Sequence, residues 1–227
     1  MKILAFDTAT AGCSVALLAH GQITERFELT MQKHGELILP MIQNLLNDAG
    51  LHLKQLDAIA VGRGPGSFIG VRIAVAVAQG LAFGANLPVI PLSTLQTLAQ
   101  TAYLQTGHSH ILPGWDARMR AIYWGGYQVN ANQLMQAIIP DSLSSPEELR
   151  PDLAIAWLPV GNAWNLYRHQ MPQMLEWREK PLELFPKARA MLELAVASYQ
   201  KGELLDPSKL EPVYLRDQVA HIKRENQ

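Results

Sequence analysis

Short apolar runs at the start of the chain follow the pattern of strands joined by turns. Apolar and β-branched residues fill most of Ile3–Phe6, Ser14–Leu18 and Ile23–Leu29. The segments between them, Asp7–Thr10 and His20–Gln22, are rich in residues that favour turns. We therefore expect a three-stranded meander in this region.

The pattern becomes helical over His34–Ala49, where apolar residues recur every three or four positions before a stop signal at Gly50. Pro40 either kinks this helix or marks its true first turn. A second helix is expected over Val71–Phe83, closed by Gly84. It is apolar nearly all the way round, which indicates burial on all sides, by the rest of the chain or by another chain.

Two further strands, Leu56–Val61 and Val89–Pro91, flank this second helix. Ser93 has the chemistry of an N-cap, and it predicts a helix that runs to about Tyr103. These elements complete a first lobe.

The pattern of the first residues returns in the second half of the chain. An apolar stretch that ends at Trp115 is followed by the turn Asp116–Arg118 and a strand over Ile122–Trp124, just as the first strand is followed by Asp7, a turn and a strand. This similarity suggests a duplicated two-lobed fold. A strand over Ala154–Val160 and an amphipathic helix over Lys187–Gln200 follow.

These elements predict an α/β protein with mixed sheets flanked by helices. The length of 227 residues suits two closely packed lobes. We assign residues 1–105 to the first lobe and 106–206 to the second, and we expect the tail, residues 207–227, to cross back to the first lobe. Apolar residues make up 48% of the chain and charged residues only 17%, so we also expect a protein partner.

Charge and cysteine content exclude several classes of protein. A net charge of −1 argues against strong binding of nucleic acid by this chain alone. Cys13 is the single cysteine, which rules out an internal disulfide and fits the cytoplasm. Polar residues interrupt the apolar stretch Val71–Leu92, so no membrane span is expected.

The glycine-rich segment GRGPGSFIGVR lies between a strand and a helix, where backbone N–H groups can bind an anion. It matches neither the P-loop nor the G-x-G-x-x-G pattern, and the glycines equally suit positive φ angles and close backbone packing. Asp7 either reaches a metal-bound phosphate or caps its turn, and the turn at Asp116 holds either a ligand or an ion pair. The candidate ligand or loop contacts are Asp7, Gly64, Gly66, Ser67, Arg72, Asp116 and Arg118.

Motifs for catalysis are missing from the sequence. The histidines form no H-x-x-x-H or H-E-x-x-H pair, and there is no G-x-S-x-G nucleophile elbow. We therefore predict no catalytic residue and no metal ligand. The two apolar helices instead predict a partner interface, formed by Leu37, Leu39, Ile42, Leu46, Val71, Ala74, Val75 and Ala78.

Four segments, ILAFDTAT, GRGPGSFIGVR, DARMRAIYW and EPVYLR, together resemble the TsaB (YeaZ) family over essentially the whole chain. The resemblance implies an actin-like fold of the ASKHA, RNase H-like class. It also implies a non-catalytic subunit that supports the catalytic TsaD subunit, with the TsaE ATPase, in making N6-threonylcarbamoyladenosine at position 37 of tRNA. The implied chain forms a homodimer when its partners are absent and contacts tRNA only indirectly. It needs no cofactor of its own, although ATP or ADP is compatible with the subunit junction.

The sequence departs from the family pattern at two places. Ile69 stands where the family usually has threonine, which weakens the case for a nucleotide at the loop, and Arg120-Ala121 replaces the usual Gly-Glu. The alternative function is a stand-alone actin-like ATPase or small-molecule kinase, based on Asp7, the glycine loop and Asp116. A metallopeptidase lacks the necessary ligand pair.

Overall fold

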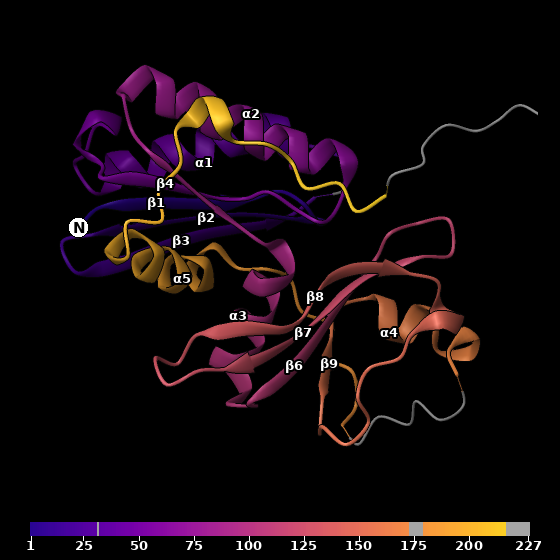
Figure 1. Ribbon diagram of the computed structural model, residues 1–227. Helices are drawn as coiled ribbons and strands as arrows, with labels where there is room; N and C mark the ends of the chain where they lie inside the picture. The colour runs from indigo at the N-terminus through magenta and orange to yellow at the C-terminus, as the bar shows by residue number, and fades with distance from the viewer. Residues whose placement is uncertain (31, 173–178, 217–227) are drawn as a thin grey trace, which may run out of the picture.

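The computed structural model describes residues 1–30, 32–172 and 179–216. A five-stranded sheet with the order β3-β2-β1-β4-β5 forms the centre of the first lobe (Figure 1). Its first three strands are antiparallel, as the predicted meander requires, and β4 and β5 run parallel to β1. The strands are β1 (Ile3–Asp7), β2 (Gly12–Ala19), β3 (Gln22–Leu29), β4 (Ala58–Gly62) and β5 (Val89–Leu92).

The second sheet repeats this arrangement with four strands in the order β8-β7-β6-β9. Three antiparallel strands are again followed by a strand parallel to the first of them. The strands are β6 (His110–Asp116), β7 (Ile122–Val129), β8 (Met135–Ser144) and β9 (Leu158–Val160). Asp7 and Asp116 each end the first strand of their sheet, so the structure confirms the predicted duplication.

Helices cover both faces of each sheet (Figure 1). The helices α1 and α2 pack on one face of the first sheet, and α5 packs on the other. On the second sheet, α3 covers one face and α4 the other. The helices are α1 (His34–Asp48), α2 (Phe68–Ala85), α3 (Thr94–Thr106), α4 (Ala163–Leu166) and α5 (Ala188–Gln200), with 3-10 turns at Leu53–Gln55, Pro146–Glu148, Arg168–Gln170 and Pro207–Lys209.

The packing of α3 and α5 differs from the predicted lobe boundaries. We assigned α3 to the first lobe and α5 to the second, but Leu95 and Leu98 of α3 pack on the second sheet, and Met191 of α5 packs on the first. The two helices also touch each other, because Gln100 Nε2 donates to Glu193 Oε2 at 2.9 Å. In each lobe, one of the helices that covers the sheet therefore comes from the other predicted half of the chain. The order of the elements along the chain does not reveal this exchange.

Some element boundaries also differ from the prediction. The helix α2 begins at Phe68 rather than Val71, because the Ser67 hydroxyl caps it by accepting the Gly70 N–H. Pro40 lies inside α1 without ending it. The strand β8 was not predicted, since Pro140 interrupts its apolar pattern; an edge strand tolerates this proline.

The tail after α5 returns to the first lobe and runs beside α2, as the yellow segment of Figure 1 shows. Leu205 and Val89 exchange backbone hydrogen bonds of 2.9 Å, which adds the tail to the edge of β5. Gln79 of α2 donates to the carbonyls of Pro207 and Leu210. The predicted crossing to the first lobe holds through Tyr214, whose hydroxyl accepts the Nε–H of Arg72, whereas Arg216 donates to the carbonyls of Ala117 and Arg118 in the second lobe. Residues 217–227 lie outside the described part of the chain.

Candidate functional site

Asp7 is buried at the end of β1, with 1% of its surface exposed. Its Oδ1 accepts the N–H of Ala9 at 2.7 Å, and its Oδ2 accepts the hydroxyl of Thr94 at 2.8 Å. Burial raises the pKa of this carboxyl, and the two hydrogen bonds oppose the rise. Both oxygens thus accept hydrogen bonds within the chain, as expected if Asp7 caps its turn rather than reaching a metal-bound phosphate.

We expect Asp7→Asn to fold and to lose part of the pH dependence of stability. Because folding raises the pKa of Asp7 above 3.8, its contribution to stability is greatest in acid and is lost as the pH rises through the folded-state pKa. The free energy of unfolding of the variant should therefore improve relative to the native protein as the pH rises. Urea titrations at pH 4 and pH 8 measure this, and a native protein that gains on the variant between these pH values would contradict it.

The glycine loop packs tightly on the turn that follows Asp7. A Cβ atom at Gly62 would lie 1.8 Å from the Asp7 carboxylate, and one at Gly66 would lie 2.3 Å from the carbonyl oxygen of Ala9. The Ser67 N–H also donates to that carbonyl, at 2.7 Å. At Gly64 the φ angle is +99°, and its carbonyl accepts the N–H of Thr94. These contacts favour the structural role of the glycines over a phosphate cradle.

Asp116 forms an equivalent turn at the end of β6. Its Oδ1 accepts the N–H of Arg118 at 2.8 Å, as Asp7 accepts that of Ala9, and also the hydroxyl of Tyr167 at 2.7 Å. The guanidinium of Arg118 lies 3.6 Å from Asp116 Oδ2 and is 87% exposed. The pair of Arg118 with Asp116 matches the ion-pair interpretation of this turn, and Arg216 of the tail also donates to the carbonyls of Ala117 and Arg118.

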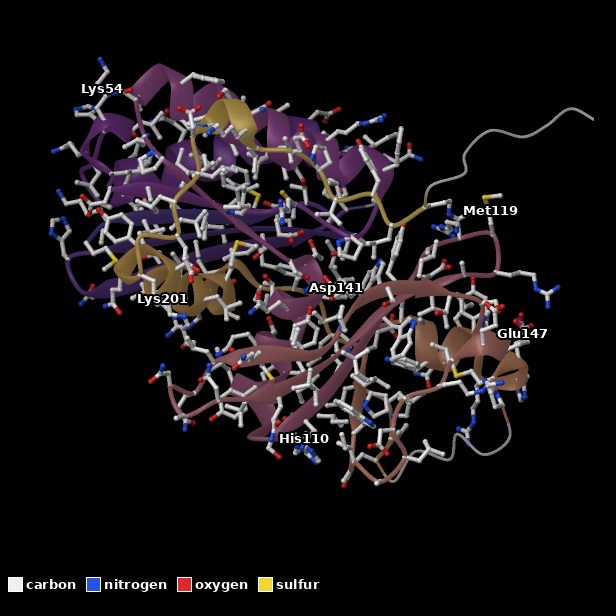
Figure 2. All side chains as sticks on the ribbon, in the orientation of Figure 1. Lys54, His110, Met119, Asp141, Glu147 and Lys201 are labelled. Atoms are coloured by element: carbon white, nitrogen blue, oxygen red, sulfur yellow. The ribbon has the colours of Figure 1, made fainter. Side chains whose placement is uncertain are left out.

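A polar network at the junction of the lobes was not predicted from the sequence. The Ser93 hydroxyl donates to Asp141 Oδ2 at 2.5 Å, and Tyr127 donates to the other oxygen of Asp141. Burial raises the pKa of Asp141. Because Thr94 follows Ser93 and binds Asp7, the start of α3 connects the carboxylates of both lobes, with Asp141 near their junction in Figure 2. The N-cap pattern at Ser93 was its single sequence signal.

The structure places six of the eight predicted interface residues inside the first lobe. They are Ile42, Leu46, Val71, Ala74, Val75 and Ala78, each at most 5% exposed and packed against the first sheet. Leu37 is half-buried, and Leu39 is 49% exposed. A partner does not reach the six buried side chains while the lobe is folded. Any interface on these helices must therefore use their other faces.

The outer face of α2 carries an apolar stripe. We call this set, exposed or half-buried and at helical spacing, the α2 stripe: Ile69, Ile73, Ala76, Val77, Gly80 and Gly84. Ile69 alone is 69% exposed. Among the described residues, α2 is the one helix long and apolar enough to cross a membrane, yet just 33% of it is buried. One such helix is weak evidence for a span, and Arg72 and Gln79 interrupt its surface.

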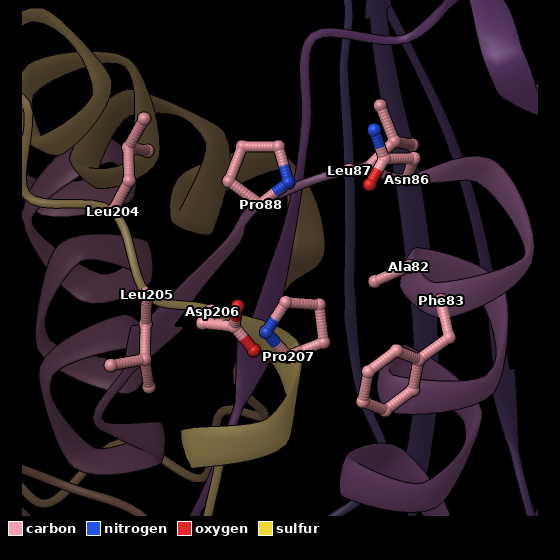
Figure 3. A pocket seen from close by; sticks show the side chains of 9 residues that line it. All are labelled: Ala82, Phe83, Asn86, Leu87, Pro88, Leu204, Leu205, Asp206 and Pro207. Atoms are coloured by element: carbon pink, nitrogen blue, oxygen red, sulfur yellow. The ribbon is translucent and has the colours of Figure 1, made fainter.

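A pocket of about 410 Å³ opens where the end of α2 meets the tail (Figure 3). Its lining combines apolar side chains such as Phe83 and Leu204 with the polar Asn86 and Asp206. None of the predicted contact residues lines it. Within the described residues, no group of three or more His, Cys, Asp or Glu side chains is arranged to hold a metal ion. The α2 stripe is therefore the candidate site that the geometry favours.

Comparison with known proteins gives consistent matches over both lobes. Residues 27–224 match the family TsaD, tRNA N6-adenosine threonylcarbamoyltransferase. The tRNA threonylcarbamoyladenosine biosynthesis protein TsaB of Escherichia coli (strain K12) is 41% identical over 98% of each chain. The protein of that name from Haemophilus influenzae is 40% identical over 98% of this chain and 97% of its own. The solved structure of YeaZ from Pseudomonas aeruginosa superposes with a TM-score of 0.88 at 40% identity, covering 94% of this chain and 99% of that one.

Proposed function

Because the chain belongs to the TsaB (YeaZ) family, with the actin-like two-lobed fold expected of it, we propose that it acts in making threonylcarbamoyladenosine in tRNA. Its role there is that of a non-catalytic subunit that binds and supports the catalytic TsaD subunit. The observation that carries this proposal is the α2 stripe, an apolar surface that the chain itself leaves uncovered. A surface of this kind needs a protein partner more than it needs a substrate.

The composition of the stripe also supports a homodimer when the catalytic subunit is absent. If two copies of α2 pack antiparallel about an axis between Ala76 and Val77, Ile69 of one copy faces Gly84 of the other. In the same register, Ile73 faces Gly80. Large side chains then fill the spaces left by glycines, as a self-complementary twofold interface requires. The single chain leaves room for this fit, because a Cβ atom at Gly80 or Gly84 would meet nothing within 4 Å.

A non-catalytic role is supported by the state of the residues that would serve a stand-alone ATPase or kinase. Asp7 is buried, and both of its carboxylate oxygens accept hydrogen bonds within the chain. The turn after Asp7 occupies the space beside the glycines of the loop, where a phosphate would have to bind. Any ATP or ADP would then bind at the junction with the catalytic subunit, where the TsaE ATPase would join. We place the complex in the cytoplasm, with tRNA bound mainly by the other subunits.

Light scattering on purified subunits tests this function. The chain alone, with a mass of 25.1 kDa, should elute as a dimer of about 50 kDa. Adding the TsaD subunit of the same organism should replace both proteins by one complex containing both chains. Two separate species at micromolar concentrations would contradict the proposal, and ATP hydrolysis by the isolated chain would favour the stand-alone enzyme instead.

A further inference from the structure

A guanidinium group is held in a fixed orientation beside the α2 stripe. The Cζ atom of Arg72 lies 3.4 Å from the centre of the Phe68 ring and 5.5 Å from that of Tyr214. The Nε of Arg72 donates to the Tyr214 hydroxyl at 2.8 Å. The two rings themselves are 6.0 Å apart at an interplanar angle of 40°. Two rings and a hydrogen bond therefore fix the plane of this side chain.

The cluster joins two distant parts of the chain. Phe68 and Arg72 lie one turn apart on α2, so their side chains share a face of the helix. Tyr214 comes from the tail, which is anchored next to it because the Val213 N–H donates to the Arg63 carbonyl at 2.8 Å. Because both supports are tied to the first lobe, Arg72 loses little side-chain freedom when it binds a ligand.

The terminal nitrogens of Arg72 have no ion pair to satisfy them. Within the described part of the chain, no carboxylate oxygen lies within 4.0 Å of this guanidinium, and its one hydrogen bond uses Nε. Arg26 and Arg120, which are also exposed, are paired with Asp48 and Glu147, whereas Arg72 is held by two aromatic rings. Arg72 thus presents two N–H-bearing atoms in a rigid fork, which matches the geometry of a carboxylate.

The surroundings indicate a protein carboxylate. Phe68 and Tyr214 are 53% and 47% exposed, and exposed aromatic rings around an arginine are typical of the residues that dominate protein interfaces. Ile69 of the α2 stripe lies next to Phe68 in the helix, so the cluster continues the proposed partner surface. A single arginine on a chain of net charge −1 is poorly suited to a nucleic-acid backbone.

We propose that Arg72, held by Phe68 and Tyr214, is a preorganised receptor for an Asp or Glu carboxylate of the catalytic partner subunit. This inference rests on the proposed function, because it assumes that the partner covers the α2 stripe. The tail then contributes to the interface through Tyr214. The apolar stripe supplies the area of contact, and the charged pair at its edge fixes the register of the partner.

Binding of the purified TsaD subunit tests this inference, by calorimetry at low and high salt. Arg72→Ala and Arg72→Lys should each weaken binding by about tenfold or more, since a lysine lacks the planar fork, and the salt dependence should fall. Tyr214→Phe, which removes the bond that orients Nε, should weaken binding a few-fold. Arg168→Ala, an exposed arginine on the second lobe, is the control and should bind normally.

The possible results separate this inference from the proposed function. If the native chain fails to bind, the proposed function fails, and this inference fails with it. If the native chain binds and the Arg72 variants bind equally well, Arg72 merely braces the tail. If subunit binding is unchanged but binding to tRNA weakens, the bound anion is a phosphate; both results overturn the inference. Where Arg72→Ala lowers the melting temperature, the binding of Arg72→Lys is the deciding measurement, because lysine keeps the positive charge beside the Phe68 ring.

Discussion

Gly70→Ala should destabilise the first lobe by about 3 kcal/mol or more. A Cβ atom at this position would lie 2.0 Å from the backbone oxygen of Thr8, and backbone does not yield as the end of a side chain does. To remove this clash, the start of α2 must move away from the turn that contains Thr8. That movement would break the 2.7 Å hydrogen bond from the Thr8 hydroxyl to the Gly70 carbonyl.

Gly35→Ala is a matched control, because it also adds a methyl group in the first turn of a helix. There the new Cβ would lie 3.8 Å from Ile73 Cδ1, an ordinary contact. We expect this variant to be as stable as the native protein or more so, by up to about 1 kcal/mol, since alanine is the better helix former. Urea unfolding followed by circular dichroism measures both. Equal midpoints for Gly70→Ala and the native protein would show that the loop is not packed as described.

Local chemistry explains why much of the fold could be predicted from the sequence. The meander follows from short apolar runs and turn residues, and the duplication follows from two aspartates that each end a strand. The segment around β8 could not be predicted in the same way, because Pro140 and the polar residues around it hide an edge strand. The exchange of α3 and α5 between the lobes was also hidden, since each amphipathic helix shows that it packs but not on which sheet.

The candidate site shows the same limit more sharply. The sequence indicated that α2 is apolar all the way round, but periodicity does not say which side meets the first sheet. Val75 and Ala76 are neighbours of similar character, yet Val75 is 5% exposed and Ala76 lies on the outer face. The network of Ser93, Tyr127 and Asp141 joins residues far apart in the chain, so no local pattern could reveal it. Three-dimensional packing decides both questions.

The exposed face of α2 leads to the second large effect: Ala76→Glu should leave the fold intact and weaken both homodimer and TsaD complex by about a hundredfold or more. Glutamate is a good helix former, and in the single chain its charge would remain in water. In either complex the charge would be buried in an apolar contact without a partner, which costs several kcal/mol. Light scattering and calorimetry measure the loss. Leu104→Glu, also at an exposed helical position, is the control and should assemble normally.

Val75→Glu, one residue earlier, should behave in the opposite way. Its side chain packs against the first sheet, so a carboxylate there would be buried in the core of the lobe and should lower the free energy of unfolding by about 3 kcal/mol or more. Loss of assembly by this variant would follow from loss of the fold and would say nothing about the interface. Circular dichroism melts separate the two cases. A folded Val75→Glu that fails to assemble, beside an Ala76→Glu that assembles normally, would mean that the partner contacts the face we assign to the core.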